Sequence, residues 1–124
     1  MIALLDSSIV VDILREYKPA KAWLKTQGQL GATRAVWIEV LEGAPNKLKQ
    51  QEAVKLLKRF DLVELATEDI IWATQALMKY GLSHKVDGYD CMIAAVSVRL
   101  QLPLFNRNIK HFAPLIGALS VKPY

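Results

Sequence analysis

The chain has 124 residues and a formal net charge of +4, and 52% of its residues are hydrophobic while 23% are charged. This length fits one domain, over residues 1–124, and this balance excludes a disordered or collagen-like chain. No apolar run approaches the roughly 18–20 residues that cross a bilayer, and the segment before Asp6 lacks the pattern of a secretory signal. We therefore expect a cytoplasmic protein without a membrane partner, in which the single Cys91 is a small core residue.

The first part of the chain predicts strands that alternate with helices. An apolar run over 2–5 ends at Asp6 and predicts a buried strand that leads into a helix carrying residues 9–14. The next elements expected are a short helix from Pro19 to near Gly28, a weak strand over 31–33 and a helix over 35–44.

The second part continues the same alternation. The pattern predicts a helix after Asn46 through residue 60, a strand over 62–65 and a helix from residue 67 that ends before Gly81. A loop over 83–89 then leads to a central helix over 90–100, which is apolar almost all round. Short elements are expected over 102–106, 108–112 and 119–121. Alternation of this kind indicates an α/β fold with a central parallel sheet of four to five strands covered by helices on both faces.

Three polar residues occupy positions that meet in such a fold. Asp6 ends the first strand, Asp90 begins the central helix and Asn108 follows a late strand. Strand carboxyl ends and the following helix starts gather along one edge of a parallel sheet, where ligands bind. Each residue could also be an ordinary helix cap, a role worth about 1 kcal/mol.

Glu39 is a stronger candidate, because it lies inside a helix where no cap explains it. At about 100° per residue it borders the apolar stripe beside Val36, whereas Glu42 points almost directly away. Glu39 can therefore reach a cleft, and we expect Glu42 to face water.

Four short motifs occur in order along the chain: Leu4-Leu5-Asp6-Ser7-Ser8, Glu39-Val40-Leu41-Glu42-Gly43, Asp90-Cys91-Met92-Ile93-Ala94-Ala95 and Asn106-Arg107-Asn108-Ile109-Lys110-His111-Phe112. With these motifs the sequence resembles PIN domains of the VapC type over nearly its whole length.

The resemblance implies a metal-dependent endoribonuclease that is the toxin of a toxin–antitoxin pair. Asp6, Glu39 and Asp90 would hold Mg²⁺ or Mn²⁺, and Asn108 would complete the catalytic site. A metal-bound water of lowered pKa could then attack an RNA phosphodiester. The partners implied are RNA, a small antitoxin that occludes the acidic cleft, and a second copy in a homodimer formed near the N-terminal half, with Trp23 as one candidate contact and Trp37 as another.

The last motif departs from the family pattern, because Asn108 and His111 are uncharged where relatives often carry an acid. A fixed second metal is therefore not expected. Ser8, Arg107 and Lys110 are candidate substrate contacts.

Other polar residues near the expected rim have weaker assignments. Asp87 could join the acidic cluster or cap the central helix, and Asp12 is expected to be exposed. Arg34 and Lys85 are more readily explained as surface charges than as RNA contacts. The two histidines, His84 and His111, are expected to be loop or surface residues.

Two other α/β functions do not fit this sequence. A haloacid-type phosphatase would have a second aspartate where this chain has Ser8, and a nucleotide-binding fold would have a glycine-rich turn after Asp6. The missing acid at Asn108 leaves one serious alternative: a PIN-like module that binds RNA or a protein partner and cuts weakly or not at all.

Overall fold

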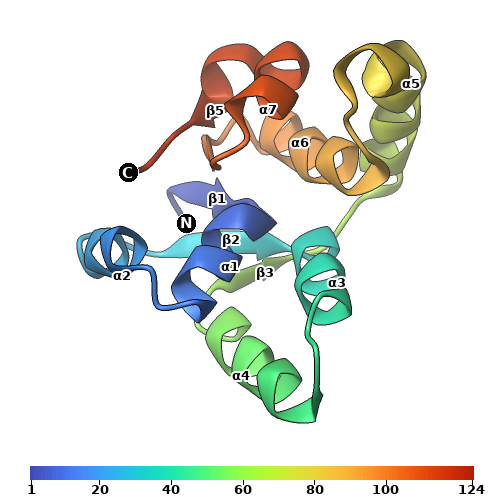
Figure 1. Cartoon of the computed structure of the whole chain (residues 1–124). Coiled ribbons are helices and arrows are strands. Elements are labelled where there is room, and N and C mark those ends of the chain that lie inside the picture. The colour runs from blue at the N-terminus through green and yellow to red at the C-terminus, as the bar shows by residue number, and fades with distance from the viewer.

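A five-stranded parallel sheet, in the order β3-β2-β1-β4-β5, forms the centre of the computed structural model, which describes residues 1–124 (Figure 1). The strands are β1 (Ala3–Leu5), β2 (Leu30–Thr33), β3 (Asp61–Val63), β4 (Leu104–Phe105) and β5 (Ser120–Val121). β1 lies between β2 and β4, with Leu4 opposite both Gly31 and Leu104. The predicted α/β fold with a parallel sheet is confirmed.

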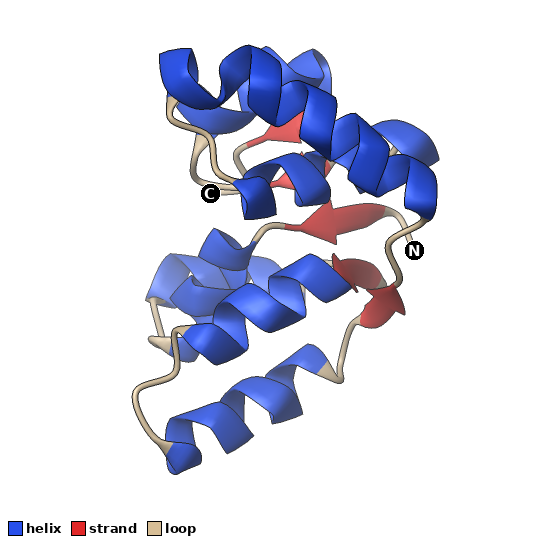
Figure 2. Cartoon of the chain, turned by 90° about the vertical axis from the view of Figure 1, so that its right-hand side faces the viewer, coloured by secondary structure: helices blue, strands red, loops and turns tan.

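Seven α-helices connect the strands. They are α1 (Ser7–Leu14), α2 (Lys18–Lys25), α3 (Arg34–Glu42), α4 (Lys47–Leu57), α5 (Thr67–His84), α6 (Gly88–Leu100) and α7 (Ile109–Ile116), and a short 3₁₀ turn (Gly117–Leu119) precedes β5. Figure 1 shows α5, α6 and α7 together in one part of the molecule and α4 far from them, and Figure 2 shows the strands between the helices. None of these helices has both the length and the hydropathy that a membrane span requires.

The core follows the apolar pattern of the sequence. All of β1 is buried, and α6 is buried around most of its circumference, including Cys91, Ile93 and Val96. Phe112 from α7 is also fully buried. The prediction that α6 is the central helix is therefore confirmed, and its placement brings Asp90 close to the end of β1.

The main difference from the predicted elements is the length of α5. The helix continues through Gly81 and ends at His84, and the φ of its C-cap Lys85, 54°, lies in the left-handed region. Glycine inside a helix costs only about 1 kcal/mol, which packing along α5 and α6 can offset. The expected loop over 83–89 is consequently short, and α6 begins at Gly88 with Asp87 as its N-cap.

Candidate functional site

The four residues predicted to be catalytic line one cavity at the carboxyl end of β1. This cavity has a volume of about 240 Å³ and is lined by Asp6, Ser7, Ser8, Val11, Glu39, Val40, Asp90 and Asn108. Helices α1, α3 and α6 and the β4–α7 connection all contribute to it. The structure thus brings together all four residues that the sequence singled out as catalytic.

Asp6 follows β1 directly and is almost completely buried. As the N-cap of α1, its Oδ2 accepts hydrogen bonds from the Ser8 backbone N–H at 3.1 Å and from the Ser8 Oγ at 2.5 Å. Asp6 is therefore both a cap and a wall of the cavity, and Ser8 fixes the direction of its carboxylate.

Glu39 enters the cavity from the middle of α3. Its side chain is half-buried, and Oε1 accepts a hydrogen bond from the Ser7 hydroxyl. Glu42 is exposed, as predicted, and accepts a hydrogen bond from the Tyr89 hydroxyl. One turn of helix thus separates a carboxylate that lines the cavity from one on the outer surface.

Asp90 is the third residue of α6, and it forms a reciprocal pair of hydrogen bonds with Asp87. The Asp90 N–H donates to Asp87 Oδ1 at 2.9 Å, and the Asp87 N–H donates to Asp90 Oδ2 at 3.2 Å. Asp87 is therefore the cap of the central helix, and it lies outside the set of residues that line the cavity. His111 Nδ1 lies 3.6 Å from Asp90 Oδ2.

Placing three carboxyl groups in a partly buried cavity raises the pKa of each of them. Burial raises the pKa of Asp6, Glu39 and Asp90 above their ordinary values, and that of Asp90 reaches about 7. The charge of Asp87 raises all three further, while hydrogen bonds from Ser8 and Ser7 lower those of Asp6 and Glu39. A cation bound in the cavity would lower these pKa values again.

The donor set fits a hard divalent ion. Neither Asp6 nor Glu39 forms an ion pair with a basic side chain. Carboxylate and amide oxygens are the ligands that Mg²⁺ and Mn²⁺ prefer. As they stand, however, no three acidic, histidine or cysteine side chains are close enough together to hold one ion. Binding by all three carboxylates therefore requires a side chain to move.

One predicted substrate contact, Arg107, and one acid, Asp12, differ from the expectation. Arg107 forms an ion pair at 2.9 Å with Asp12, so Asp12 is not the exposed residue that its sequence position suggested, and its side chain is only 14% exposed. Lys110 is exposed on α7 and forms no ion pair. Arg34 pairs with Glu64, away from the cavity.

Three functional candidates were missed by the sequence analysis. Ser7 bonds Glu39 across 32 positions of sequence, which no local pattern reveals, although it directly follows Asp6. His111 lies at the surface as expected, but its Nδ1 also approaches Asp90, which the sequence did not indicate. Asn106 is completely buried and accepts a hydrogen bond from the Asn108 N–H at 3.0 Å, so it shapes the turn that carries Asn108.

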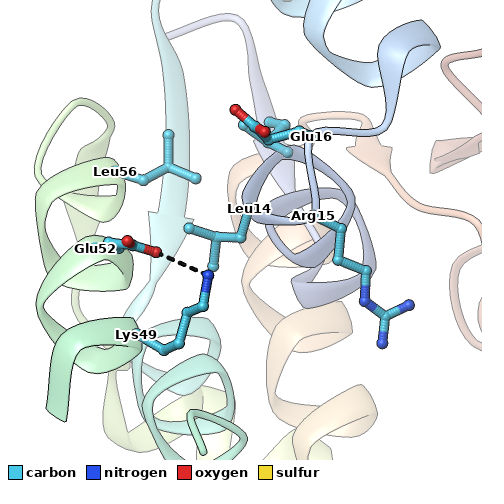
Figure 3. Close-up of a pocket in the computed structure, with 7 residues that line it drawn as sticks. Leu14, Arg15, Glu16, Lys49, Glu52 and Leu56 are labelled. Atoms are coloured by element: carbon cyan, nitrogen blue, oxygen red, sulfur yellow. Dashed lines mark ion pairs between the residues drawn. The ribbon is translucent and has the colours of Figure 1, made fainter. Parts of the chain in front are cut away.

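The acidic cavity continues into a groove between α1, α3 and α4. A hollow of about 420 Å³ shares Val11, Glu39 and Val40 with the cavity. It also shares Leu14, Arg15, Lys49 and Glu52 with a further hollow of about 480 Å³, shown in Figure 3. There Leu14 and Leu56 provide apolar surface, and Lys49 pairs with Glu52 at 3.4 Å. An extended or helical segment in this groove would lead to the carboxylates.

Comparison with known proteins gives a consistent result. The family model described as "PIN domain" matches residues 3–113. Ribonuclease VapC19 of Mycobacterium tuberculosis (strain ATCC 25618 / H37Rv) is 32% identical over 118 residues, which cover 88% of this chain and 90% of that protein.

The structural similarity extends over almost the whole chain. A solved toxin–antitoxin complex from Klebsiella pneumoniae contains a chain with a TM-score of 0.80 at 25% identity, covering 98% of both chains. VapC20 of Mycobacterium tuberculosis, described as a Sarcin-Ricin loop cleaving toxin, has the same fold, with a TM-score of 0.75 at 13% identity and coverage of 98% of this chain and 99% of that one.

Proposed function

The chain belongs to the PIN domain family, and we propose that it is a metal-dependent endoribonuclease, the toxin of a toxin–antitoxin pair. The observation that carries this proposal is the cavity in which Asp6, Glu39 and Asp90 meet without a lysine or arginine to neutralise them. The ribonuclease relative and the toxin–antitoxin complex named above support RNA as substrate and an antitoxin as partner.

The chemistry proposed needs no covalent intermediate. Asp6, Glu39 and Asp90 would hold Mg²⁺ or Mn²⁺, and the amide oxygen of Asn108 would face the same ion or its water. A divalent ion so bound supplies a water of lowered pKa for attack on a phosphodiester. Ser8 holds the Asp6 carboxylate in place through two hydrogen bonds.

The groove offers a physical basis for inhibition by an antitoxin. It begins at Glu39 in the acidic cavity and provides apolar contacts at Leu14 and Leu56. A partner segment lying in it could place a basic side chain next to the carboxylates, neutralising them and excluding both metal and RNA.

We also propose that two copies pair through α5. Ile70, Ile71, Leu77, Met78 and Leu82 are all exposed, Met78 by 82% and Leu82 by 100%. At about 100° per residue they share one arc of the helix, which contains no charged residue. A continuous exposed apolar face of this kind indicates an interface.

The charges at the two ends of α5 favour a second copy as the occupant of this face. Glu68 lies in the first turn, while Lys79 and Lys85 lie towards the other end. A twofold axis allows two α5 helices to pair antiparallel, which would place Glu68 of one copy near the lysine-bearing end of α5 in the other. The sequence expectation was pairing near the N-terminal half, with Trp23 and Trp37 as candidate contacts. We propose α5 instead, because Trp23 and Trp37 are partly buried and pack against the core.

A non-catalytic binding module remains the alternative, and one observation favours it: no three ligand side chains are grouped tightly enough for an ion as they stand. Such a module would bind RNA equally well with or without metal. Purified protein and a labelled RNA separate the two, since binding without cleavage in both Mg²⁺ and Mn²⁺ would support the module.

The direct test of function is RNA cleavage with Mg²⁺, with Mn²⁺ and with excess chelator. We expect cleavage only with metal, and we expect Asp6→Asn and Glu39→Gln to abolish it, because each removes a charged ligand. Glu42→Gln on the outer face of α3 and Asp61→Asn on β3 are matched controls and should cut like the wild type. Undiminished cleavage in chelator would overturn the proposal.

A further inference from the structure

Arg107 lies outside the acidic cavity, in a cluster of four side chains that the proposed mechanism does not use. This Arg107 cluster consists of Arg107 from the β4–α7 connection, Asp12 from α1, Tyr17 before α2 and Tyr124 after β5. Its members come from four separate segments, so it joins parts of the chain that are distant in sequence.

Within the cluster the Arg107 guanidinium is held on several sides. Its Nη1 donates to Asp12 Oδ2 at 2.9 Å, and its Cζ lies 5.1 Å from the ring centroid of Tyr17 and 5.6 Å from that of Tyr124. The Tyr124 hydroxyl donates to the same Asp12 oxygen at 2.6 Å. Stacking on two aromatic rings together with a charge-assisted hydrogen bond restricts the side chain strongly.

The backbone of Arg107 connects this cluster to the acidic cavity. Its N–H donates to Ser8 Oγ at 3.2 Å, and Ser8 Oγ in turn donates to Asp6 Oδ2 at 2.5 Å. The next residue, Asn108, lines the cavity itself. A displacement of Arg107 would therefore change the Ser8–Asp6 hydrogen bond that orients Asp6, and it would also shift Asn108.

The other side of the connection is fixed independently. The Asn106 N–H donates to the Val121 carbonyl at 2.9 Å, and the Asn106 amide donates to the Leu104 carbonyl and to Ser120 Oγ. Asn106 thus anchors the connection to β4 and β5 on the inside. The Arg107 cluster is the corresponding anchor on the outside, next to Ser8.

We propose that Arg107 is a positioning residue. Its side chain is held by Asp12, Tyr17 and Tyr124, and its backbone thereby keeps Ser8 and Asn108 at their positions relative to the Asp6 carboxylate. This inference rests on the proposed function, because it assigns a role within the same site. It differs from the sequence expectation that Arg107 contacts substrate phosphate, and the two roles predict different kinetic effects.

The first test measures the geometry without relying on activity. Tyr124→Phe removes the hydroxyl that bonds Asp12 and keeps the aromatic ring, so ring-current effects are nearly unchanged. In ¹H–¹⁵N correlation spectra of the metal-free protein, we expect the amide signals of Ser8 and Asn108 to move in this variant. The matched control is Tyr80→Phe on α5, whose hydroxyl makes no hydrogen bond to the protein, and it should leave both signals in place.

The second test separates positioning from substrate contact. We expect Tyr124→Phe and Arg107→Lys to lower kcat for RNA cleavage about fivefold, the factor that one net hydrogen bond is worth, with KM within about twofold of wild type. A phosphate contact predicts instead a raised KM in Arg107→Lys with kcat unchanged.

The outcomes are distinguishable from failure of the proposed function. A wild-type protein that does not cleave RNA would refute that function and leave the amide signals to decide the positioning role. Ser8 and Asn108 signals that stay unmoved in Tyr124→Phe would overturn the inference. So would a wild-type kcat in both variants of an active enzyme.

Discussion

Asp90 has two structural roles that conflict in the metal-free protein. Its carboxylate accepts the Asp87 N–H at the start of α6, and it also lines the acidic cavity. Burial and the neighbouring carboxylates raise its pKa to about 7. Ionisation of Asp90 therefore opposes folding unless a cation is present.

This conflict predicts a pH dependence of stability. Because the folded pKa of Asp90 lies above its value of 3.8 in the unfolded chain, its contribution to stability is fully present below about pH 4 and is lost as the pH rises through about 7. From pH 5 to pH 8 we expect the metal-free wild type to lose roughly 1–2 kcal/mol more than Asp90→Asn, after allowance for solvent screening. Urea denaturation at both pH values measures this, and equal losses would contradict it.

The same variant should also lose the response to metal. Mn²⁺ at about a hundred times its dissociation constant stabilises a folded protein by roughly 2.7 kcal/mol. We expect this gain in the wild type and only a small part of it in Asp90→Asn, since a ligand is missing. Thermal melts with and without Mn²⁺ provide the measurement. Equal shifts in the two proteins would show that Asp90 acts only as part of a helix cap.

A substitution at Asn108 should strengthen metal binding, where Asp90→Asn weakens it. Asn108 lines the cavity at a position that offers only an amide oxygen, and Asn108→Asp would add a charged hard ligand. We expect Mn²⁺ affinity to increase several-fold in a calorimetric titration. Asn46→Asp, at the cap of the distant helix α4, is the matched control and should bind Mn²⁺ like the wild type. An unchanged affinity in Asn108→Asp would mean that Asn108 does not face the ion.

The sequence was informative for residues whose position follows from topology. Asp6 and Asn108 follow parallel strands, so the order of the elements along the chain is enough to predict that they meet. The contacts of Asp12 could not be predicted, because its partners Arg107 and Tyr124 lie 95 and 112 positions away. Ser7 was missed for the same reason, since its partner Glu39 belongs to another helix.

At the scale of elements, the start of α5 depends on a buried acid. Asp69 accepts the Ala66 N–H at 2.8 Å and forms an ion pair with Arg99 of α6 at 2.9 Å, with its side chain only 1% exposed. The sequence predicted Asp69 near a helix start but not its pairing with Arg99. The predicted end of α5 before Gly81 was also wrong. A glycine usually marks a helix end, but here the packing of α5 on α6 lets the helix continue through it to His84.

We expect Asp69→Ala to lower the free energy of unfolding by about 2–4 kcal/mol, because it removes both a backbone partner and the counter-ion of Arg99. Glu68→Ala, at the exposed neighbouring position, should change it by less than about 0.5 kcal/mol. Denaturant unfolding of both variants provides the comparison. Similar stabilities for the two would show that the Asp69–Arg99 pair contributes little.

At the scale of the whole molecule, the fold separates two surfaces. The acidic cavity lies at the carboxyl end of β1, where α1, α3, α6 and the β4–α7 connection meet, and its groove lies between α1, α3 and α4, whereas the apolar face proposed for pairing belongs to α5. In Figure 1, α5 lies far from α4. Pairing through α5 would consequently leave the groove of each copy open to RNA or to an antitoxin.

The pairing is tested by placing charge on this face. Met78→Lys combined with Leu82→Lys should convert a dimer to a monomer, because two lysines per copy would be buried at the interface. Analytical ultracentrifugation reports the mass. Leu48→Lys is the control, since Leu48 is an exposed leucine on α4 and its replacement should leave the dimer intact. A wild-type protein that sediments as a monomer would refute the pairing.

The most direct test of the central claim is a single Mn²⁺ titration in which bound metal and RNA cleavage are measured on the same samples. Electron paramagnetic resonance gives bound Mn²⁺, and a labelled RNA gives the cleavage rate. We predict that both rise along one curve in the wild type and that both are lost in Asp6→Asn. Cleavage by Asp6→Asn at the wild-type rate, or cleavage before any Mn²⁺ is bound, would contradict the assignment of the acidic cavity as the site of a metal-dependent ribonuclease.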